Sequence, residues 1–265
     1  MKMSSSTNDK FKDTNVQQVI NRIALLQLPV TSIKSQNIQT AKEYIIKAYK
    51  SGASLCVLPE IWNSPYATSA FAEYAEVLPN VGDALPHLLE SSEKEDEENS
   101  NEKKEGCFPW GESSQFLMNM AQQTNMYIVG GSIPEKVTTS SNSDDNDKIY
   151  NTCLIINPKG QVVGKHRKVH LFDVNVPGGI CFKESDTLTG GEQGATYFDV
   201  SDHGDGGNES GLGRIGVGIC YGMCFYQSSL RLFIHCHPLL IISTSQQIRN
   251  QLNMQIFASQ SMHYY

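Results

Sequence analysis

Three side chains of contrasting chemistry, a thiol, a carboxylate and an ammonium, lie at or near the ends of strand-like segments. Cys220 follows the apolar, glycine-containing run at residues 214–219, Glu60 follows the apolar run at 55–58, and Lys168 lies between two strand-like pieces. A free cysteine has a pKa of about 8.5, so a catalytic thiol needs a base or a cation beside it. A partly desolvated glutamate can accept the thiol proton, and an ammonium can stabilise charge that develops on a substrate oxygen. The three residue types together offer a nucleophile, a base and a cation.

Each of these residues also has an ordinary structural interpretation. A free cysteine often packs as a small apolar residue, and an isolated glutamate or lysine is usually solvated. His166 and His170 flank Lys168 and offer a Cys–His pair as an alternative. Residues 235–237, His-Cys-His, follow Cys220, but their spacing matches no common zinc pattern, and adjacent strand residues point to opposite faces. We therefore expect no metal site.

Composition favours one domain with a small-molecule partner. The chain has 265 residues and a net charge of −7, with no long basic stretch of the kind that binds nucleic acid. Seven cysteines, an odd number, are scattered through apolar runs without the spacing of a disulfide framework. Reduced thiols predict a cytoplasmic location, with the mitochondrion as the alternative.

Membrane association is not expected. Residues 1–15 are polar and lack the apolar core of a secretory signal or an anchor. The longest apolar stretch, residues 230–242, is interrupted by Arg231, two histidines and Pro238. It is too short and too polar to cross a bilayer.

The N-terminal half predicts a β-α-β unit. A short apolar run at residues 23–26 favours a strand, and residues 37–50 carry apolar side chains at helical spacing, followed by Gly52 at the expected cap. Residues 55–58 form the next expected strand. The two strands should be parallel and covered by the helix.

Further elements follow in alternation. We expect a helix at residues 113–125, a strand at 127–131, and a β-hairpin of residues 150–157 and 161–165 around the turn signal Asn-Pro-Lys-Gly. The domain organisation that we predict is a disordered tail at residues 1–17 and one domain at 18–265, interrupted by polar, flexible insertions at 91–107, 136–148 and 201–213.

Four segments resemble, in order and spacing, motifs of the nitrilase superfamily of carbon–nitrogen hydrolases: residues 59–66, 165–178, 182–185 and 216–221. The resemblance runs from about residue 20 to about residue 221. The stretches His-Leu-Phe-Asp at 170–173 and Asn-Ser-Pro-Tyr at 63–66 are most similar to the omega-amidase branch. Members of that branch hydrolyse the terminal amides of small dicarboxylic acids such as 2-oxoglutaramate and 2-oxosuccinamate.

The resemblance implies a role for each matching residue. It makes Glu60 the general base, Lys168 the cation that stabilises the tetrahedral intermediate, and Cys220 the nucleophile that forms a thioester. Glu184 matches a second glutamate that helps to orient the lysine and the substrate. The backbone N–H of Tyr221 would complete the oxyanion site.

The resemblance also implies a fold and partners. The expected fold is an α/β, nitrilase-like α-β-β-α sandwich that forms a homodimer and uses no metal or organic cofactor. The implied partner is a small amide substrate. Tyr66 either contacts that substrate or packs as an aromatic side chain under a loop.

The chain departs from the family pattern after the cysteine. The family usually continues with Asp and then Arg-Phe, whereas residues 222–225 here are Gly-Met-Cys-Phe. Residues 239–243 could form the next strand, but 245–265 are polar and show no later strand or helix. We therefore expect an incomplete C-terminal part, which would expose a sheet edge. The alternative function is a truncated, non-catalytic or weakly active homologue that acts as a binding or scaffold protein.

Overall fold

The structure is a computed structural model, and it describes most of the expected hydrolase-like domain. The described residues are 22–85, 108–138, 147–179, 181–194, 196–200, 213–220, 222, 240–244 and 256–258. The tail expected at residues 1–17 and the insertion expected at 91–107 lie outside them. In the insertion expected at 136–148, residues 136–137 and 148 belong to strands, and residues 139–146 lie outside the description. In the insertion expected at 201–213, residue 213 begins a strand, and residues 201–212 lie outside the description.

The first sheet has six strands, and its parallel part confirms the expected β-α-β unit. Its order is β1-β2-β3-β5-β4, with β6 also paired to β5. Strands β1 and β2 are parallel, as are β2 and β3, whereas β5 is antiparallel to its neighbours. The strands are β1 (Arg22–Leu25), β2 (Ala53–Val57), β3 (Tyr127–Val129), β4 (Ile133–Val137), β5 (Lys148–Ile156) and β6 (Val162–Arg167).

The predicted hairpin is confirmed. Strands β5 and β6 are antiparallel and are joined by a turn in which the N–H of Gly160 donates to the carbonyl of Asn157 at 2.9 Å. Gly160 has a φ of 72°, which a glycine adopts without steric cost.

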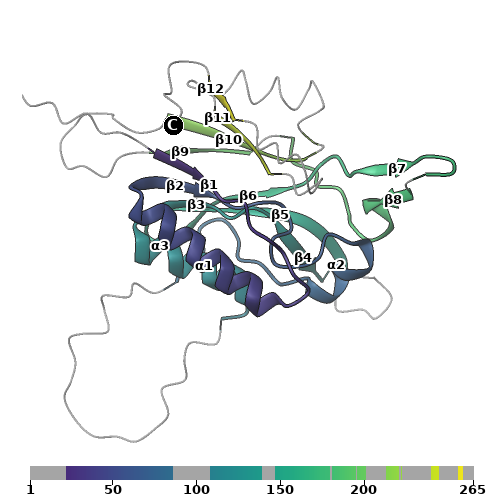
Figure 1. Cartoon of the computed structure of the whole chain (residues 1–265), viewed down its shortest axis with the longest axis horizontal. Helices are drawn as coiled ribbons and strands as arrows, with labels where there is room; N and C mark the ends of the chain where they lie inside the picture. Colours follow the sequence, from purple (N-terminus) through teal and green to yellow (C-terminus); the bar gives the residue numbers. More distant parts are fainter. Residues whose placement is uncertain are drawn as a thin grey trace, which may run out of the picture.

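Two long helices, α1 (Lys34–Lys50) and α3 (Glu112–Thr124), lie side by side over one face of this sheet (Figure 1). Both lie within three residues of the ranges that the apolar spacing predicts. Helix α1 buries Ala41, Ile45 and Ala48 at intervals of three or four residues, the spacing of one helical face. A third, short helix, α2 (Thr68–Tyr74), follows β2 and contacts β4.

Helix α3 is capped by a carboxylate from a distant segment. Its N-cap residue, Gly111, has no side chain to accept a hydrogen bond, and Glu76 Oε2 instead accepts the N–H of Ser113 at 3.0 Å. Glu76 Oε1 accepts the Ser113 hydroxyl at 2.7 Å and pairs with Lys34 at 2.9 Å. A negative charge at a helix N-terminus is favourable because the exposed N–H groups carry partial positive charge. This contact fixes α3 on the sheet.

The second sheet packs against the other face of the first (Figure 1). Its order is β12-β11-β10-β9, with strands β9 (Thr196–Val200), β10 (Gly213–Ile219), β11 (Leu240–Thr244) and β12 (Ile256–Ala258). Strand β10 is antiparallel to β9 and parallel to β11. The described residues thus form a helix layer and two sheet layers. Residues 223–239, between β10 and β11, lie outside the description.

One expectation about the C-terminal region is wrong. A strand at residues 239–243 is expected and is found as β11, but no later strand is expected and β12 is present. Strand β12 pairs antiparallel with β11 through Leu240↔Ala258, Ile241↔Phe257 and Ile242↔Ile256. A strand of three residues is too short to produce a recognisable alternation of apolar and polar residues, which explains why the sequence pattern misses it.

Two apolar cores hold the layers together. One lies between the helices and the first sheet, and includes Ile45, Leu117, Met118, Ile128 and Leu154. The other lies between the sheets, where Leu55, Val57, Val129, Cys153 and Ile155 meet Phe198, Val200, Ile215, Val217 and Ile219. Among the described residues, none of the helices is long and apolar enough to cross a membrane.

Candidate active site

Glu60 lies just beyond the end of β2, in a loop that is fastened to the turn after β3. Its side chain is buried, with 1% of its surface exposed. The next residue, Ile61, has a φ of 48°, a conformation that β-branched residues rarely adopt. Ser132 holds it there, because its hydroxyl accepts the N–H of Ile61 at 3.1 Å and its own N–H donates to Pro59 at 3.2 Å. The loop that carries Glu60 is therefore tied down on both sides.

Lys168 follows directly after β6, and its ammonium lies between two carboxylates. Its Nζ is 2.9 Å from Oε1 of Glu60 and 2.8 Å from Oε1 of Glu184. All three side chains are at most 1% exposed. Buried charges persist only when they are paired and hydrogen-bonded, and this arrangement supplies both conditions.

Glu184 begins a short 3₁₀ helix, η2 (Glu184–Asp186), after the two-stranded hairpin β7 (Asp173–Asn175) and β8 (Cys181–Lys183). Its Oε2 accepts the backbone N–H of Phe172 at 2.7 Å, and its Oε1 accepts the hydroxyl of Tyr66 in addition to the ammonium of Lys168. The Tyr66 ring stacks on Phe182 and meets Phe71 edge-on. Tyr66 therefore packs among aromatic side chains and also contacts the buried carboxylate; the expected substrate contact stays a prediction.

Asn151, on β5, joins the same cluster. Its Nδ2 donates to Oε1 of Glu60 at 2.9 Å, and its main-chain carbonyl accepts the N–H of Lys168 at 2.8 Å. The side chain is fully buried. Sequence reasoning does not single out this residue, although a buried amide on a strand is a signal of a polar partner.

Cys220 stands directly after the last residue of β10 and adopts a φ of 43°. Left-handed backbone at a residue other than glycine is uncommon, and such strain is concentrated at functional sites. The side chain is partly exposed and packs against the inter-sheet core. Negative charge on Cys220 acts on two members of the buried cluster, because it contributes to the raised pKa values of Lys168 and Tyr66. The backbone of Tyr221 lies outside the described residues.

The electrostatics of the cluster favour a charged lysine and a glutamate that can take up a proton. Burial raises the pKa of Glu60, and Glu184 raises it further, whereas Lys168 and the amide of Asn151 act in the opposite direction. Burial alone would lower the pKa of Lys168, but the charges of Glu60, Glu184 and Cys220 outweigh it and raise that pKa. A carboxylate with a raised pKa holds a proton more readily than a solvated one, which suits a group that must accept and return a proton.

Comparison with known proteins gives the family. The sequence profile of the family described as "Carbon-nitrogen hydrolase" matches residues 22–260. The chain belongs to the carbon–nitrogen hydrolase family. The predicted superfamily is therefore confirmed.

Curated relatives place this hydrolase-family chain near the omega-amidase branch. It is 37% identical over 204 residues to omega-amidase NIT2 of Homo sapiens, covering 77% of this chain and 56% of the relative. It is 38% identical over 208 residues to a chloroplastic omega-amidase of Arabidopsis thaliana, covering 78% of this chain and 44% of the relative. The chain thus spans about half the length of these relatives.

Solved structures confirm the nitrilase-like fold. The hydrolase-family chain matches Saccharomyces cerevisiae Nit3, a member of branch 10 of the nitrilase superfamily, with a TM-score of 0.57 and 33% identity over 83% of this chain and 63% of that one. A point mutant of the amidase from Nesterenkonia sp. AN1 matches with a TM-score of 0.52 over 84% of this chain and 66% of that one. That protein is 16% identical, so it supports the fold alone.

His166 faces the second sheet and is engaged there. Its Nδ1 lies 3.0 Å from the Oγ1 of Thr196 on β9, and burial lowers its pKa to about 4. The histidine is consequently neutral at neutral pH. Its described contact is with a hydroxyl and links β6 to β9, which favours a structural role over the alternative of a Cys–His pair.

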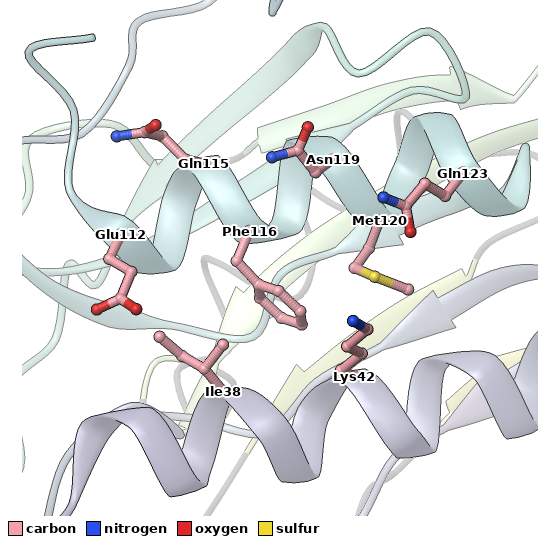
Figure 2. Close-up of a pocket in the computed structure, with 8 residues that line it drawn as sticks. All are labelled: Ile38, Lys42, Glu112, Gln115, Phe116, Asn119, Met120 and Gln123. Carbon is pink, nitrogen blue, oxygen red and sulfur yellow. The ribbon is translucent and has the colours of Figure 1, made fainter. Parts of the chain in front are cut away.

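Two surface hollows of the hydrolase-family chain lie away from this cluster. A groove of about 470 Å³ runs between α1 and α3, and Figure 2 shows Ile38, Phe116 and Met120 along it, with polar side chains around them. A second hollow of about 820 Å³ lies along β6 and β9 and is lined by residues such as Lys165, Arg167 and Tyr197. Neither includes Glu60, Lys168 or Cys220 among its described lining residues. Within the described part of the chain, no group of three or more His, Cys, Asp or Glu is placed to hold a metal ion.

Proposed function

We propose that this chain carries the catalytic site of an amidase that releases ammonia from the terminal carboxamide of small dicarboxylic acid monoamides, of the 2-oxoglutaramate and 2-oxosuccinamate type. The observation that carries the proposal is the buried contact of the Lys168 ammonium with the carboxylates of Glu60 and Glu184. Relatives named as omega-amidases supply the substrate class.

In the first half of the reaction the thiol of Cys220 becomes acylated. Glu60 accepts the proton from Sγ as the sulfur attacks the carboxamide carbon, and the carbonyl oxygen becomes an oxyanion. Lys168 stabilises that charge from a site where water is excluded, so the interaction is stronger than it would be in solvent. The C–N bond then breaks, Glu60 returns the proton to the leaving nitrogen, and ammonia departs from a thioester on Cys220.

In the second half a water molecule hydrolyses the thioester. Glu60 takes a proton from the water as its oxygen attacks the thioester carbon, and a second oxyanion forms beside Lys168. The C–S bond breaks, the proton passes from Glu60 to Sγ, and the carboxylic acid is released. Each half begins and ends with the same protonation state of Glu60, so the proton transfers balance.

The remaining site residues support these steps. Glu184 also accepts a hydrogen bond from the ammonium of Lys168, and the Tyr66 hydroxyl in turn donates to Glu184. In this proposal the backbone N–H of Tyr221 is a second donor to the oxyanion, and Tyr66 borders the substrate.

Ammonia release by the purified full chain tests the proposal. With 2-oxoglutaramate as substrate, Cys220→Ala should lower kcat by about a thousandfold or more, because the proposed attacking sulfur is removed. Cys181→Ala, which removes an exposed cysteine on β8, is the matched control and should retain activity. Intact mass spectrometry should find an acyl adduct on the wild-type chain.

Two results would contradict the proposal. Turnover that survives Cys220→Ala refutes the nucleophile. A folded chain that releases no ammonia and forms no adduct would instead support the non-catalytic binding or scaffold alternative. The expected homodimer and the cytoplasmic or mitochondrial location stay predictions, which light scattering and fractionation of cells would test.

A further inference from the structure

The two oxygens of Glu60 have different surroundings. Oε1 accepts two hydrogen bonds, from Nζ of Lys168 and from Nδ2 of Asn151, both at 2.9 Å. Oε2 is buried and has no hydrogen-bond partner among the described residues. A buried acceptor without a donor costs free energy, so such atoms are found where a reacting group or an unseen partner binds.

Asn151 fixes both of the groups that Oε1 contacts. Its amide nitrogen must face Glu60, because an ionised carboxylate can only accept hydrogen bonds and the amide oxygen would repel it. Its main-chain carbonyl accepts the N–H of Lys168 at 2.8 Å, which sets where the lysine leaves β6. One residue on β5 therefore positions the carboxylate through its side chain and the ammonium through its backbone.

We propose that Asn151 is a positioning residue which holds Oε1 of Glu60 against Lys168, so that Oε2 is the oxygen that exchanges protons with Cys220, the leaving nitrogen and water. The inference rests on the proposed function and deepens it. It assigns the proton transfers to one atom and gives the buried amide of Asn151 a function.

Loss of the Asn151 side-chain amide has a predictable effect on the pH dependence of the reaction rate. The charged and titratable groups that act on Glu60 are Lys168 and Glu184, while the hydrogen bond from Asn151 also lowers the pKa of Glu60. The Tyr66 hydroxyl faces the same cluster through Glu184. Without the amide donor, Glu60 holds its proton up to a higher pH. Because it must be ionised to act as a base, the acidic limb of the rate profile should move to higher pH.

The experiment compares Asn151→Ala and Asn151→Leu, which both remove the amide donor without adding a charge, with the control Thr152→Val. Thr152 is equally buried on the same strand but bonds to Glu135, outside the cluster. The first readout is the pH profile of kcat/KM for ammonia release. The second is the pH profile of alkylation of Cys220 by iodoacetamide, read by peptide mass spectrometry, which requires no turnover.

We expect both Asn151 variants to lower kcat/KM by about 10- to 100-fold, as misplacement of a catalytic group does, and to move both profiles to higher pH. Thr152→Val should leave the position of both profiles unchanged. Damage to folding alone would lower the rates without moving the acidic limb, and thermal melting identifies such damage. The alanine variant decides if the leucine variant does not fold. Unshifted profiles in a folded variant would overturn the inference. If the wild-type chain releases no ammonia but the Asn151 variants still move the pH profile of Cys220 alkylation, the proposed substrate is overturned. The role of Asn151 is then still supported.

Discussion

The α-carbon of Gly131 faces the main-chain carbonyl of Pro59, so closely that a Cβ atom on Gly131 would lie 2.1 Å from the Pro59 oxygen. Gly131 also has a φ of 62°, which glycine adopts readily and other residues do not. The contact lets the turn after β3 lie directly against the loop that presents Glu60. A missing side chain at one position thus determines where a buried carboxylate stands.

Gly131→Ala should destabilise the protein and displace Glu60. The new methyl group has to push back main-chain atoms, which costs about 1–3 kcal/mol by overpacking, and the left-handed backbone adds roughly 1–2 kcal/mol. Urea unfolding and ammonia release per folded chain measure the two effects. Gly178→Ala is the matched control, because Gly178 has a φ of 72° but nothing lies within 4 Å of its added Cβ. Equal losses in the two variants would show that the contact with Pro59 is unimportant.

Lys168→Met should be strongly destabilising at neutral pH, and less so in acid. Removing the ammonium leaves the carboxylates of Glu60 and Glu184 buried without a counter-charge, which costs about 3–5 kcal/mol. At low pH Glu60, whose pKa is raised, can take up a proton, so the difference from the wild type should shrink. The raised pKa of Lys168 means that its stabilising charge is fully present below its unfolded pKa of about 10.4 and is lost only as pH rises through the folded value.

Urea unfolding at pH 8 and at pH 5 checks this prediction. Lys42→Met, which removes an exposed lysine beside the groove of Figure 2, should change the free energy of unfolding by no more than about 0.5 kcal/mol. A loss for Lys168→Met that grows as pH falls would contradict the assignment of the buried ion cluster.

The sequence predicts the β-α-β unit, helix α3, the β5–β6 hairpin and, in the buried cluster, Glu60 and Lys168, and the reasons are local. Residues 55–58 end in Glu60, and residues 161–165 lead to Lys168, so a strand-end residue can be recognised from its own neighbourhood. Asn151 and Gly131 cannot be recognised in this way. Asn151 meets Glu60 across 91 positions of the chain, and Gly131 matters because of the Pro59 carbonyl. Such contacts depend on strand register and on the spacing between loops, which composition and periodicity do not specify.

The cysteines should differ widely in their reaction with iodoacetamide. Burial raises the pKa of Cys56 and of Cys153 to about 12, and neither side chain is more than 1% exposed, so both should react only when the chain unfolds. Cys220 is partly exposed and acts electrostatically on the ammonium of Lys168, so we expect it to react fastest, ahead of the exposed Cys181. A time course at neutral pH, read by peptide mass spectrometry, measures the order. Labelling of Cys56 at the rate of Cys220 would contradict the arrangement.

His166 should make the protein less stable as pH falls below about 6.5. Its folded pKa is about 4, whereas an unfolded histidine has a pKa of about 6.5, so between these values the unfolded chain binds a proton that the folded chain does not. The contribution of His166 to the free energy of unfolding is fully present above about pH 6.5. About 3 kcal/mol of that contribution is lost as pH falls to about 4. His166→Gln, which stays neutral, should flatten that part of the stability profile measured by urea unfolding. The control Thr196→Val removes the hydroxyl partner but keeps the buried imidazole, so the free energy of unfolding should fall with pH as it does in the wild type. If His166→Gln also keeps that fall, another group causes the acid sensitivity.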